Sequence, residues 1–254
     1  MDNTPTFIFR QPHTLDELEQ LIRLRYTIFK TAHPNLFPDN EYGLDLDNYD
    51  PLAHHFGVYK SGLMGEYPVG YLRTITTEPT ETGLLVQKLA KKFEMSAVLN
   101  EPLDYPLPVM QYFPDADKVI GDLLKTLQGK GEKLFEASRL CLLQEVESLH
   151  LARFITESTV AVFSYNFSTK INAVICCKDI HERLYQSCFF MPCSDLKRNQ
   201  FTGASEPRCI SLLLQQNVKS IIPNAIEEKW QRMANDFKTT GRIEYVKRVV
   251  VLAA

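Results

Sequence analysis

The segment from Leu134 to Leu143 is mostly apolar, but Glu136 and Arg139 place charges inside it. Its length and composition predict a buried strand. A charge inside a central strand is costly unless an opposite charge pairs with it. The chain must therefore bring partners for Glu136 and Arg139 to this strand, and the resulting cluster is either a structural ion network or a functional site.

Hydrophobic periodicity predicts helices and strands that alternate along the chain. A Thr-x-x-Glu capping box starts the first helix at Thr14, and we expect it to end near Lys30. The strands 54–60 and 69–76 flank a turn and predict a hairpin. Further predicted helices span residues 82–93, 119–127, 149–163, 180–188 and 224–237. Further predicted strands span residues 7–9, 134–143, 173–177, 189–191, 209–214 and 242–252.

Hairpins beside alternating helices and strands predict an α/β fold with a mixed sheet and helices on both of its faces. A proline-rich and aromatic stretch, residues 96–117, interrupts the pattern. Proline fixes φ and removes a backbone donor, so we expect an irregular insertion there, either a lid or an ordinary packed loop. The polar residues 194–207 predict a second loop. We expect a single domain over residues 1–254.

Charge and composition argue against several classes of protein. Lys plus Arg number 28 and Asp plus Glu number 31, which gives a formal net charge of −3. Proteins that neutralise many phosphates usually carry a positive excess, so we expect no nucleic-acid partner. No apolar run approaches the roughly 18 residues of a membrane span, and Met1–Pro5 does not resemble a secretory signal. Six cysteines in such a chain are expected as reduced thiols in the cytoplasm.

The cysteines and histidines are also candidate metal ligands. Cys176, Cys177, His181, Cys188 and Cys193 are close in sequence, but their spacing fits a zinc site only loosely. Cysteines in an apolar strand behave as small hydrophobic residues. We therefore predict buried thiols and no metal site. The pair His54-His55 points to opposite faces of its strand, so we expect satisfied or surface histidines.

Four motifs occur in a suitable order along the first part of the chain: Leu24-Arg25-Tyr26-Thr27-Ile28-Phe29, Asp47-Asn48-Tyr49-Asp50, Val69-Gly70-x-x-Arg73 and Phe135-Glu136-x-Ser138-Arg139. As an ordered set they resemble the autoinducer-synthase branch of the GNAT N-acyltransferase superfamily. That branch includes acyl-homoserine lactone synthases, N-acyl amino acid synthases and exosortase-associated acyltransferases. The resemblance covers roughly the first 145 residues.

The resemblance implies a GNAT-like fold and transfer of a fatty acyl group from a thioester to an amine. It implies that Glu136 is the base, acting directly or through water, and that Ser138 and Arg139 belong to the catalytic group. Backbone N–H groups near a bulge in the same strand would stabilise the oxyanion. The resemblance also implies a set of substrate-binding residues: Arg25, Phe29, Asp47, Asp50 and Arg73.

Two features bear on the substrates. Homoserine lactone synthases commonly carry a tryptophan after the first helix, but here residues 31–37 contain none, which favours an amino acid over S-adenosylmethionine as acceptor. Coenzyme-A-using GNAT enzymes usually have a glycine-rich loop after the central strand, whereas residues 144–150 contain no glycine and two acids. This favours an acyl carrier protein over coenzyme A as donor, with no resident cofactor.

Alternative interpretations remain. The helix over residues 82–93 carries Lys88, Lys91 and Lys92, which form either a solvated face or a docking surface for an acyl carrier protein. Within the enzyme class, the rival function is acyl-homoserine lactone synthesis from S-adenosylmethionine. Outside it, the rival is a non-catalytic module that binds acyl groups or carrier proteins.

Overall fold

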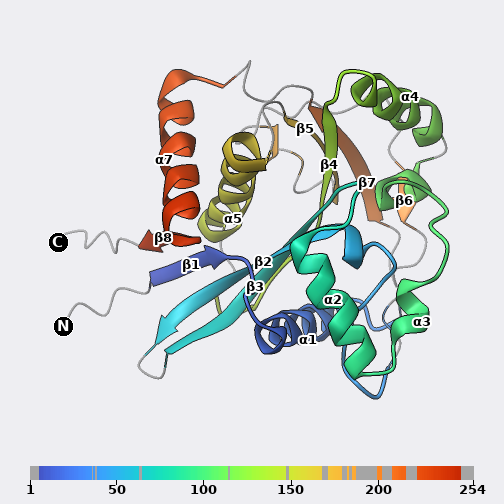
Figure 1. The fold of residues 1–254 in the computed structure, drawn as a ribbon, viewed down its shortest axis with the longest axis vertical. Helices are drawn as coiled ribbons and strands as arrows, with labels where there is room; N and C mark the ends of the chain where they lie inside the picture. The colour runs from blue at the N-terminus through green and yellow to red at the C-terminus, as the bar shows by residue number, and fades with distance from the viewer. Residues whose placement is uncertain are drawn as a thin grey trace.

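A mixed sheet of eight strands organises the described part of the chain in the computed structural model (Figure 1). The structure describes residues 6–246 apart from 36, 38, 63–64, 114, 147–148, 168–170, 179–181, 183–184, 187–198, 202–207 and 216–221. The strand order is β6-β7-β5-β4-β3-β2-β1-β8. The strands are β1 Thr6–Arg10, β2 Ala53–Gly62, β3 Gly65–Ile75, β4 Lys133–Leu142, β5 Ile171–Lys178, β6 Asn199–Phe201, β7 Arg208–Gln215 and β8 Arg242–Val246.

Helices cover both faces of this sheet, as the sequence predicts (Figure 1). The α-helices are α1 Leu15–Ala32, α2 Glu81–Lys92, α3 Ser96–Leu99, α4 Ala116–Gln128, α5 Leu149–Val162 and α7 Asn224–Thr240. The 3₁₀ helices are η1 Asp50–Leu52 and η2 Pro108–Tyr112, and η3 Phe163–Phe167 is a π-helix. Helices α5 and α7 pack on one face, whereas α1, α2 and α4 pack on the other.

The pairing confirms the predicted mixed sheet. Strands β4 and β5 are parallel, and the other neighbouring strands are antiparallel. The crossover between β4 and β5 runs through α5, as a parallel pair requires. The predicted hairpin is present as β2 and β3.

Helix α1 begins where the capping box predicts. The Thr14 hydroxyl accepts a hydrogen bond from the Glu17 N–H at 3.2 Å, while the Glu17 carboxylate accepts from the His13 N–H at 2.7 Å. The helix ends at Ala32, slightly beyond the predicted Lys30. Its buried face continues from Leu18, Leu21 and Ile22 to Arg25, so helical periodicity carries an arginine beneath the sheet.

Two loop predictions need correction. The segment 96–117 is not wholly irregular, because it contains α3 and η2 and ends inside the first turn of α4. Pro108 fits the start of η2, where its missing N–H has no helical partner to lose. Residues 199–201, expected within a loop, form β6 and pair with β7. Three largely polar residues at a sheet edge carry too little periodicity to predict a strand.

Some sequence predictions fall outside the described residues. These are the strand over 189–191, most of the helix over 180–188, and the last strand beyond residue 246. The remaining predicted helices and strands are present with small shifts at their ends. In the described ranges, we find no helix with the length and apolar character needed to span a membrane.

Strand β4 changes partners along its length. It pairs with β5 from Lys133 to Ala137, but beyond that point only its ladder with β3 continues. Between the pairs Tyr71–Cys141 and Arg73–Ser138, one residue of β3 faces two residues of β4, which is the pattern of a β-bulge. Strand β4 therefore leaves β5 after Ala137 and bulges at Arg139 and Leu140, a few residues beyond Glu136.

Candidate active site

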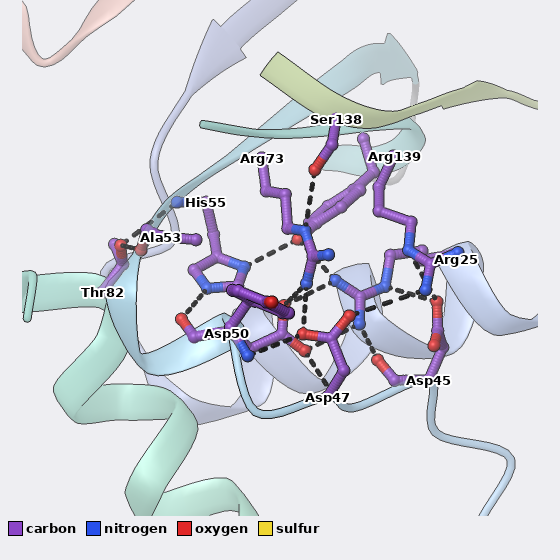
Figure 2. Close-up of polar contacts among 12 residues, drawn as sticks. Arg25, Asp45, Asp47, Asp50, Ala53, His55, Arg73, Thr82, Ser138 and Arg139 are labelled. Carbon is purple, nitrogen blue, oxygen red and sulfur yellow. Dashed lines mark hydrogen bonds and ion pairs between the residues drawn. The ribbon is translucent and has the colours of Figure 1, made fainter. Parts of the chain in front are cut away.

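Asp50 lies at the centre of a buried cluster of charged side chains (Figure 2). Its Oδ1 accepts hydrogen bonds from Arg25 Nη1 at 2.9 Å and from Arg73 Nη1 at 2.7 Å. Its Oδ2 accepts from Arg25 Nη2 and from the Asp47 backbone N–H, both at 2.9 Å. One carboxylate thus joins α1, β3 and the acidic loop, residues 45–49, that precedes η1.

Arg73 connects this cluster to the central strand. Its Nε donates to Ser138 Oγ of β4 at 3.0 Å, and its Nη1 also donates to Asp47 Oδ1 at 2.6 Å. Arg25 makes a further ion pair with Asp45, with 2.8 Å between Nε and Oδ2. The structure therefore brings together all four segments that carry the sequence motifs.

Mutual neutralisation explains how these charges tolerate burial. Burial alone would raise the pKa of Asp50, but Arg25 and Arg73 lower it well below its ordinary value. The pKa of Arg73 is raised in turn, because Asp47 and Asp50 outweigh the effect of burial. Arg25 and Asp50 have no exposed surface. Both side chains are therefore ionised and fixed in place.

A neutral histidine supports the cluster from β2. The His55 Nε2 lies 2.9 Å from the Asp50 backbone oxygen, and Nδ1 lies 2.7 Å from the Tyr71 hydroxyl. Because a carbonyl only accepts, Nε2 carries the proton and Nδ1 accepts from Tyr71. Burial lowers the pKa of His55 to about 4. His55 is thus a satisfied buried histidine, as expected, while His54 contacts Phe163 on the opposite face.

Glu136 is almost completely buried on β4. Its Oε2 accepts a hydrogen bond from the Val109 backbone N–H at 2.9 Å. Burial raises its pKa to about 8, although the Val109 N–H, Arg73 and Arg139 act in the opposite direction. A carboxyl group with this pKa is mostly protonated at neutral pH and becomes a base just above it.

Arg139 occupies the bulge of β4 with an unusual backbone conformation. Its φ of +59° lies in the left-handed region, which non-glycine residues rarely adopt. Its guanidinium lies 5.5 Å from the ring centroid of Phe29 and 5.1 Å from that of Phe37. Longer ion pairs link it to Asp47 at 3.5 Å and Asp45 at 3.9 Å. Such backbone strain is typical of functional sites.

Solvent reaches only one side of the cluster. The side chains of Arg139 and Asp47 are 28% and 25% exposed, whereas those of Arg25 and Asp50 are fully buried. Phe29 and Ser138 are partly buried. The sequence-predicted residues therefore divide into a buried framework and a solvent-facing group around Arg139.

The sequence prediction omitted several residues of the cluster. Asp45 belongs to the same acidic loop, and its charge was the available signal. His55 and Tyr71 follow the alternation of ordinary strands, so nothing in the pattern distinguished them. Phe37 lies in the segment after α1, and it stacks on Phe29 with 5.3 Å between the ring centroids.

A groove of about 380 Å³ lies elsewhere, between α5, α7 and β8. Its lining includes Arg153, Glu157 and Lys229 and shares no residue with the cluster around Asp50. Within the residues that the structure describes, no group of three or more His, Cys, Asp or Glu side chains could hold a metal ion. The loosely spaced His181, Cys188 and Cys193 lie outside those residues.

Comparison with known proteins finds similarity to acyltransferases of solved structure. FeeM, an N-acyl amino acid synthase from uncultured soil microbes, has a TM-score of 0.49 and 15% identity, with 83% of this chain and 91% of that chain covered. The acyl-homoserine lactone synthase LasI has a TM-score of 0.45 and 13% identity over 83% and 88% of the two chains. An acyl-CoA N-acyltransferase from Pseudomonas aeruginosa has a TM-score of 0.43 and 12% identity over 82% and 97%.

Because these TM-scores lie below 0.5, the similarities support no conclusion about the chemistry of this chain. The sequence matches no protein-family model. It also matches no curated protein.

Proposed function

We propose that the protein is an N-acyltransferase that moves a fatty acyl group from a thioester to the amine of an amino acid or a related small molecule. The observation that carries this proposal is the environment of Glu136. A carboxyl group with a pKa of about 8 lies on the central strand, just before β4 leaves β5 and beside the bulge that holds Arg139. A structural ion network does not need a protonated acid at that place.

In the proposed reaction, the amine nitrogen attacks the carbonyl carbon of the thioester. Only a neutral amine is nucleophilic, so ionised Glu136 accepts its proton, directly or through a water molecule. The neutral nitrogen forms the new C–N bond, and negative charge develops on the carbonyl oxygen. The C–S bond then breaks, and the leaving thiolate takes up the proton that the acylated nitrogen loses, which gives a neutral amide and a thiol. A pKa near 8 suits this role, because the carboxylate is then basic enough to accept the proton and still ionises near neutral pH.

The separation of β4 from β5 supports a position for the thioester. Beyond Ala137, the edge of β4 that faces β5 has no ladder partner in β5. Backbone N–H groups on that edge, together with those at the bulge, are available to donate to the carbonyl oxygen as negative charge develops on it.

The acceptor would bind on the exposed side of the cluster. A guanidinium is suited to holding a carboxylate, and that of Arg139 is partly exposed. Asp47 is the partly exposed acid beside it and would hold the ammonium group before deprotonation. Arg25, Asp50 and Arg73 are buried, so in this proposal they position Asp47, Ser138 and the acidic loop rather than touch the acceptor. Phe29 would pack against the acceptor beside Arg139.

An acyl carrier protein is the donor that we favour over coenzyme A. The junction between β4 and α5, residues 144–150, offers no glycine for close approach to a pyrophosphate and carries two acids. The exposed lysines of α2 would complement the acidic surface of a carrier protein.

Mass spectrometry of lipid extracts from cells that overproduce the protein tests this proposal. An N-acyl amino acid that is missing with the Glu136→Gln variant is the expected result. Glu145→Gln, a change at an exposed acid after β4, is the matched control and should leave the product unchanged. An acyl lactone would instead indicate the homoserine lactone reaction. No new product, together with retained acyl-ligand binding by the purified protein, would favour a binding module.

A further inference from the structure

The acidic loop also holds the insertion that covers Glu136. The Asn48 side-chain Nδ2 donates to the backbone oxygens of Pro102 at 3.0 Å and Glu101 at 3.3 Å. The Tyr49 hydroxyl donates to the Tyr105 backbone oxygen at 2.9 Å. Two consecutive side chains thus bind the backbone of one segment, residues 101–105, which lies more than 50 positions further along the chain.

The same segment reaches Glu136 a few residues later. The Val109 N–H at the start of η2 donates to Glu136 Oε2 at 2.9 Å. Leu107 and Val109 have no exposed surface and belong to the same apolar cluster as Tyr49. The backbone from 101 to 109 is therefore fixed by the acidic loop at one end and contacts the buried acid at the other.

We propose that Asn48 and Tyr49 are positioning residues that hold the segment 101–109 so that the Val109 N–H binds Glu136 and fixes its carboxyl group in the site. This inference rests on the proposed function in so far as Glu136 is the base. Neither residue touches Glu136 through a hydrogen bond that we find in the described ranges. Each therefore acts through the insertion.

The arrangement also connects the two halves of the site. Asn48 and Tyr49 lie between Asp47, which pairs with Arg73 and Arg139, and Asp50, which pairs with Arg25 and Arg73. The acidic loop therefore has two roles. It supplies Asp47, the carboxylate proposed to bind the acceptor, and it fixes the insertion that covers Glu136. A single short segment sets the spacing between acceptor and base.

The Val109 N–H has a definite electrostatic effect. A hydrogen bond to a carboxylate favours the ionised form, and this contact lowers the pKa of Glu136 against the effect of burial. Other ionisable groups near Glu136 come from every neighbouring element: Arg73 of β3, Asp47 and Tyr49 of the acidic loop, Tyr112 of η2, Arg139 of β4 and Cys176 of β5. Asn48→Ala removes none of these groups, whereas Tyr49→Phe removes the Tyr49 hydroxyl, so the Asn48 variant isolates the effect of the Val109 N–H.

The test uses Tyr49→Phe, which removes one hydroxyl, and Asn48→Ala, which removes one amide. Tyr67→Phe, at an exposed tyrosine of β3, is the matched control. Two quantities are measured across pH. The first is the hydrogen-exchange rate of the Val109 amide. The second is the infrared band of the Glu136 carboxyl group, which is identified by its absence in Glu136→Gln. We expect at least tenfold faster exchange at Val109 and a rise of about 1 in the pKa of Glu136 in both variants, and neither change in the control.

If the protein transfers acyl groups, kcat at pH 7 should fall roughly tenfold in these variants and recover towards the wild-type value at high pH. Unchanged exchange at Val109 and an unchanged carboxyl band in a folded variant would overturn the inference. Should Tyr49→Phe fail to fold, Asn48→Ala still decides the question. Wild-type protein without acyl transfer would overturn the proposed function alone, because exchange and band positions do not depend on turnover.

Discussion

Asp50 accepts hydrogen bonds from two arginines although none of its own surface is exposed to solvent. Around it, three acids face three arginines: Asp45, Asp47, Asp50, Arg25, Arg73 and Arg139. The cluster is therefore formally neutral, which is the condition for burying so many charges. Removing one member leaves an opposite charge without compensation.

Asp50→Asn tests this balance through stability. The amide keeps the shape of the side chain but leaves Arg25 and Arg73 with too few negative charges in a buried environment. We expect the free energy of unfolding to fall by about 3–5 kcal/mol in urea titrations at neutral pH. The control is Asp39→Asn, because Asp39 pairs with Lys30 at the surface and is 91% exposed. A loss below about 1 kcal/mol would contradict a cluster that depends on Asp50.

The bulge in β4 allows a comparison of two substitutions at Arg139. Both Arg139→Gly and Arg139→Ala remove the guanidinium, but only glycine adopts a φ of +59° without steric cost. We therefore expect the glycine variant to be more stable than the alanine variant by about 1 kcal/mol, measured by chemical denaturation. Alanine as the more stable variant would show that the backbone relaxes when the arginine is lost.

The sequence identified most charged members of the cluster, but not how they are arranged. From the ordered motifs we expected a cluster at the strand of Ser138 and Arg139. The structure confirms that its other members lie there: Arg25, Asp47, Asp50 and Arg73. The motifs gave no means of telling that Arg25 is fully buried while Arg139 reaches solvent. That difference depends on how the acidic loop folds over α1 and β3, and no local pattern encodes such a long-range contact.

Helix α2 carries three exposed lysines, one of which also contacts α1. Lys88, Lys91 and Lys92 are all exposed, and Lys92 also forms an ion pair with Glu19 of α1, with 2.7 Å between Nζ and Oε2. A docking surface for an acidic carrier protein would therefore use Lys88 and Lys91. Reversing Lys92 as well would break a contact between α1 and α2 and confuse binding with stability.

The double change Lys88→Glu and Lys91→Glu tests carrier-protein docking. We expect KM for an acyl carrier protein to rise several-fold at low salt and the difference to shrink above about 0.5 M salt, where charges are screened. KM for a small acyl thioester should not change. The same reversal at the exposed Lys118 and Lys125 of α4 is the control. An unaltered KM for the carrier protein at low salt would exclude α2 as the docking surface.

The insertion shows why some elements escape prediction. Its prolines predicted irregular backbone, and yet Pro108 starts η2, because the first turn of a helix does not use that N–H. The contact between Val109 and Glu136 joins residues 27 positions apart. The composition of the insertion predicts neither η2 nor the contact with Glu136, because both depend on how the insertion packs against β4.

For the whole molecule, alternating periodicities predicted the mixed sheet but not its strand order. The hairpin of β2 and β3 is local and was predictable, whereas β1 pairs with β8 from the other end of the chain, with Phe7 opposite Tyr245. The end of the β4–β5 ladder at Ala137 also depends on long-range pairing and was not predictable from the sequence. Hydrophobic patterns report which face of a strand is buried, but not which strand lies beside it.

Two buried groups should give the stability of the whole protein an unusual dependence on pH. The pKa of Glu136 is about 8 in the folded state, against 4.5 for an ordinary carboxyl group, so stability falls as pH rises between these values. The pKa of His55 is about 4, against an ordinary 6.5, so stability falls as pH drops below 6.5. Above pH 6.5, therefore, Glu136 is the one of these two groups that still makes stability depend on pH.

Glu136→Gln should therefore remove the loss of stability on the alkaline side. Glutamine has no proton to lose, so the free energy of unfolding of the variant, relative to wild type, should increase by about 2 kcal/mol between pH 6.5 and pH 8. Urea titrations at the two pH values measure this, and Glu145→Gln should show no such increase, because that acid is exposed. A difference that stays constant with pH would mean that Glu136 is already ionised when the protein is folded, and would remove the basis for its role as a base with a raised pKa.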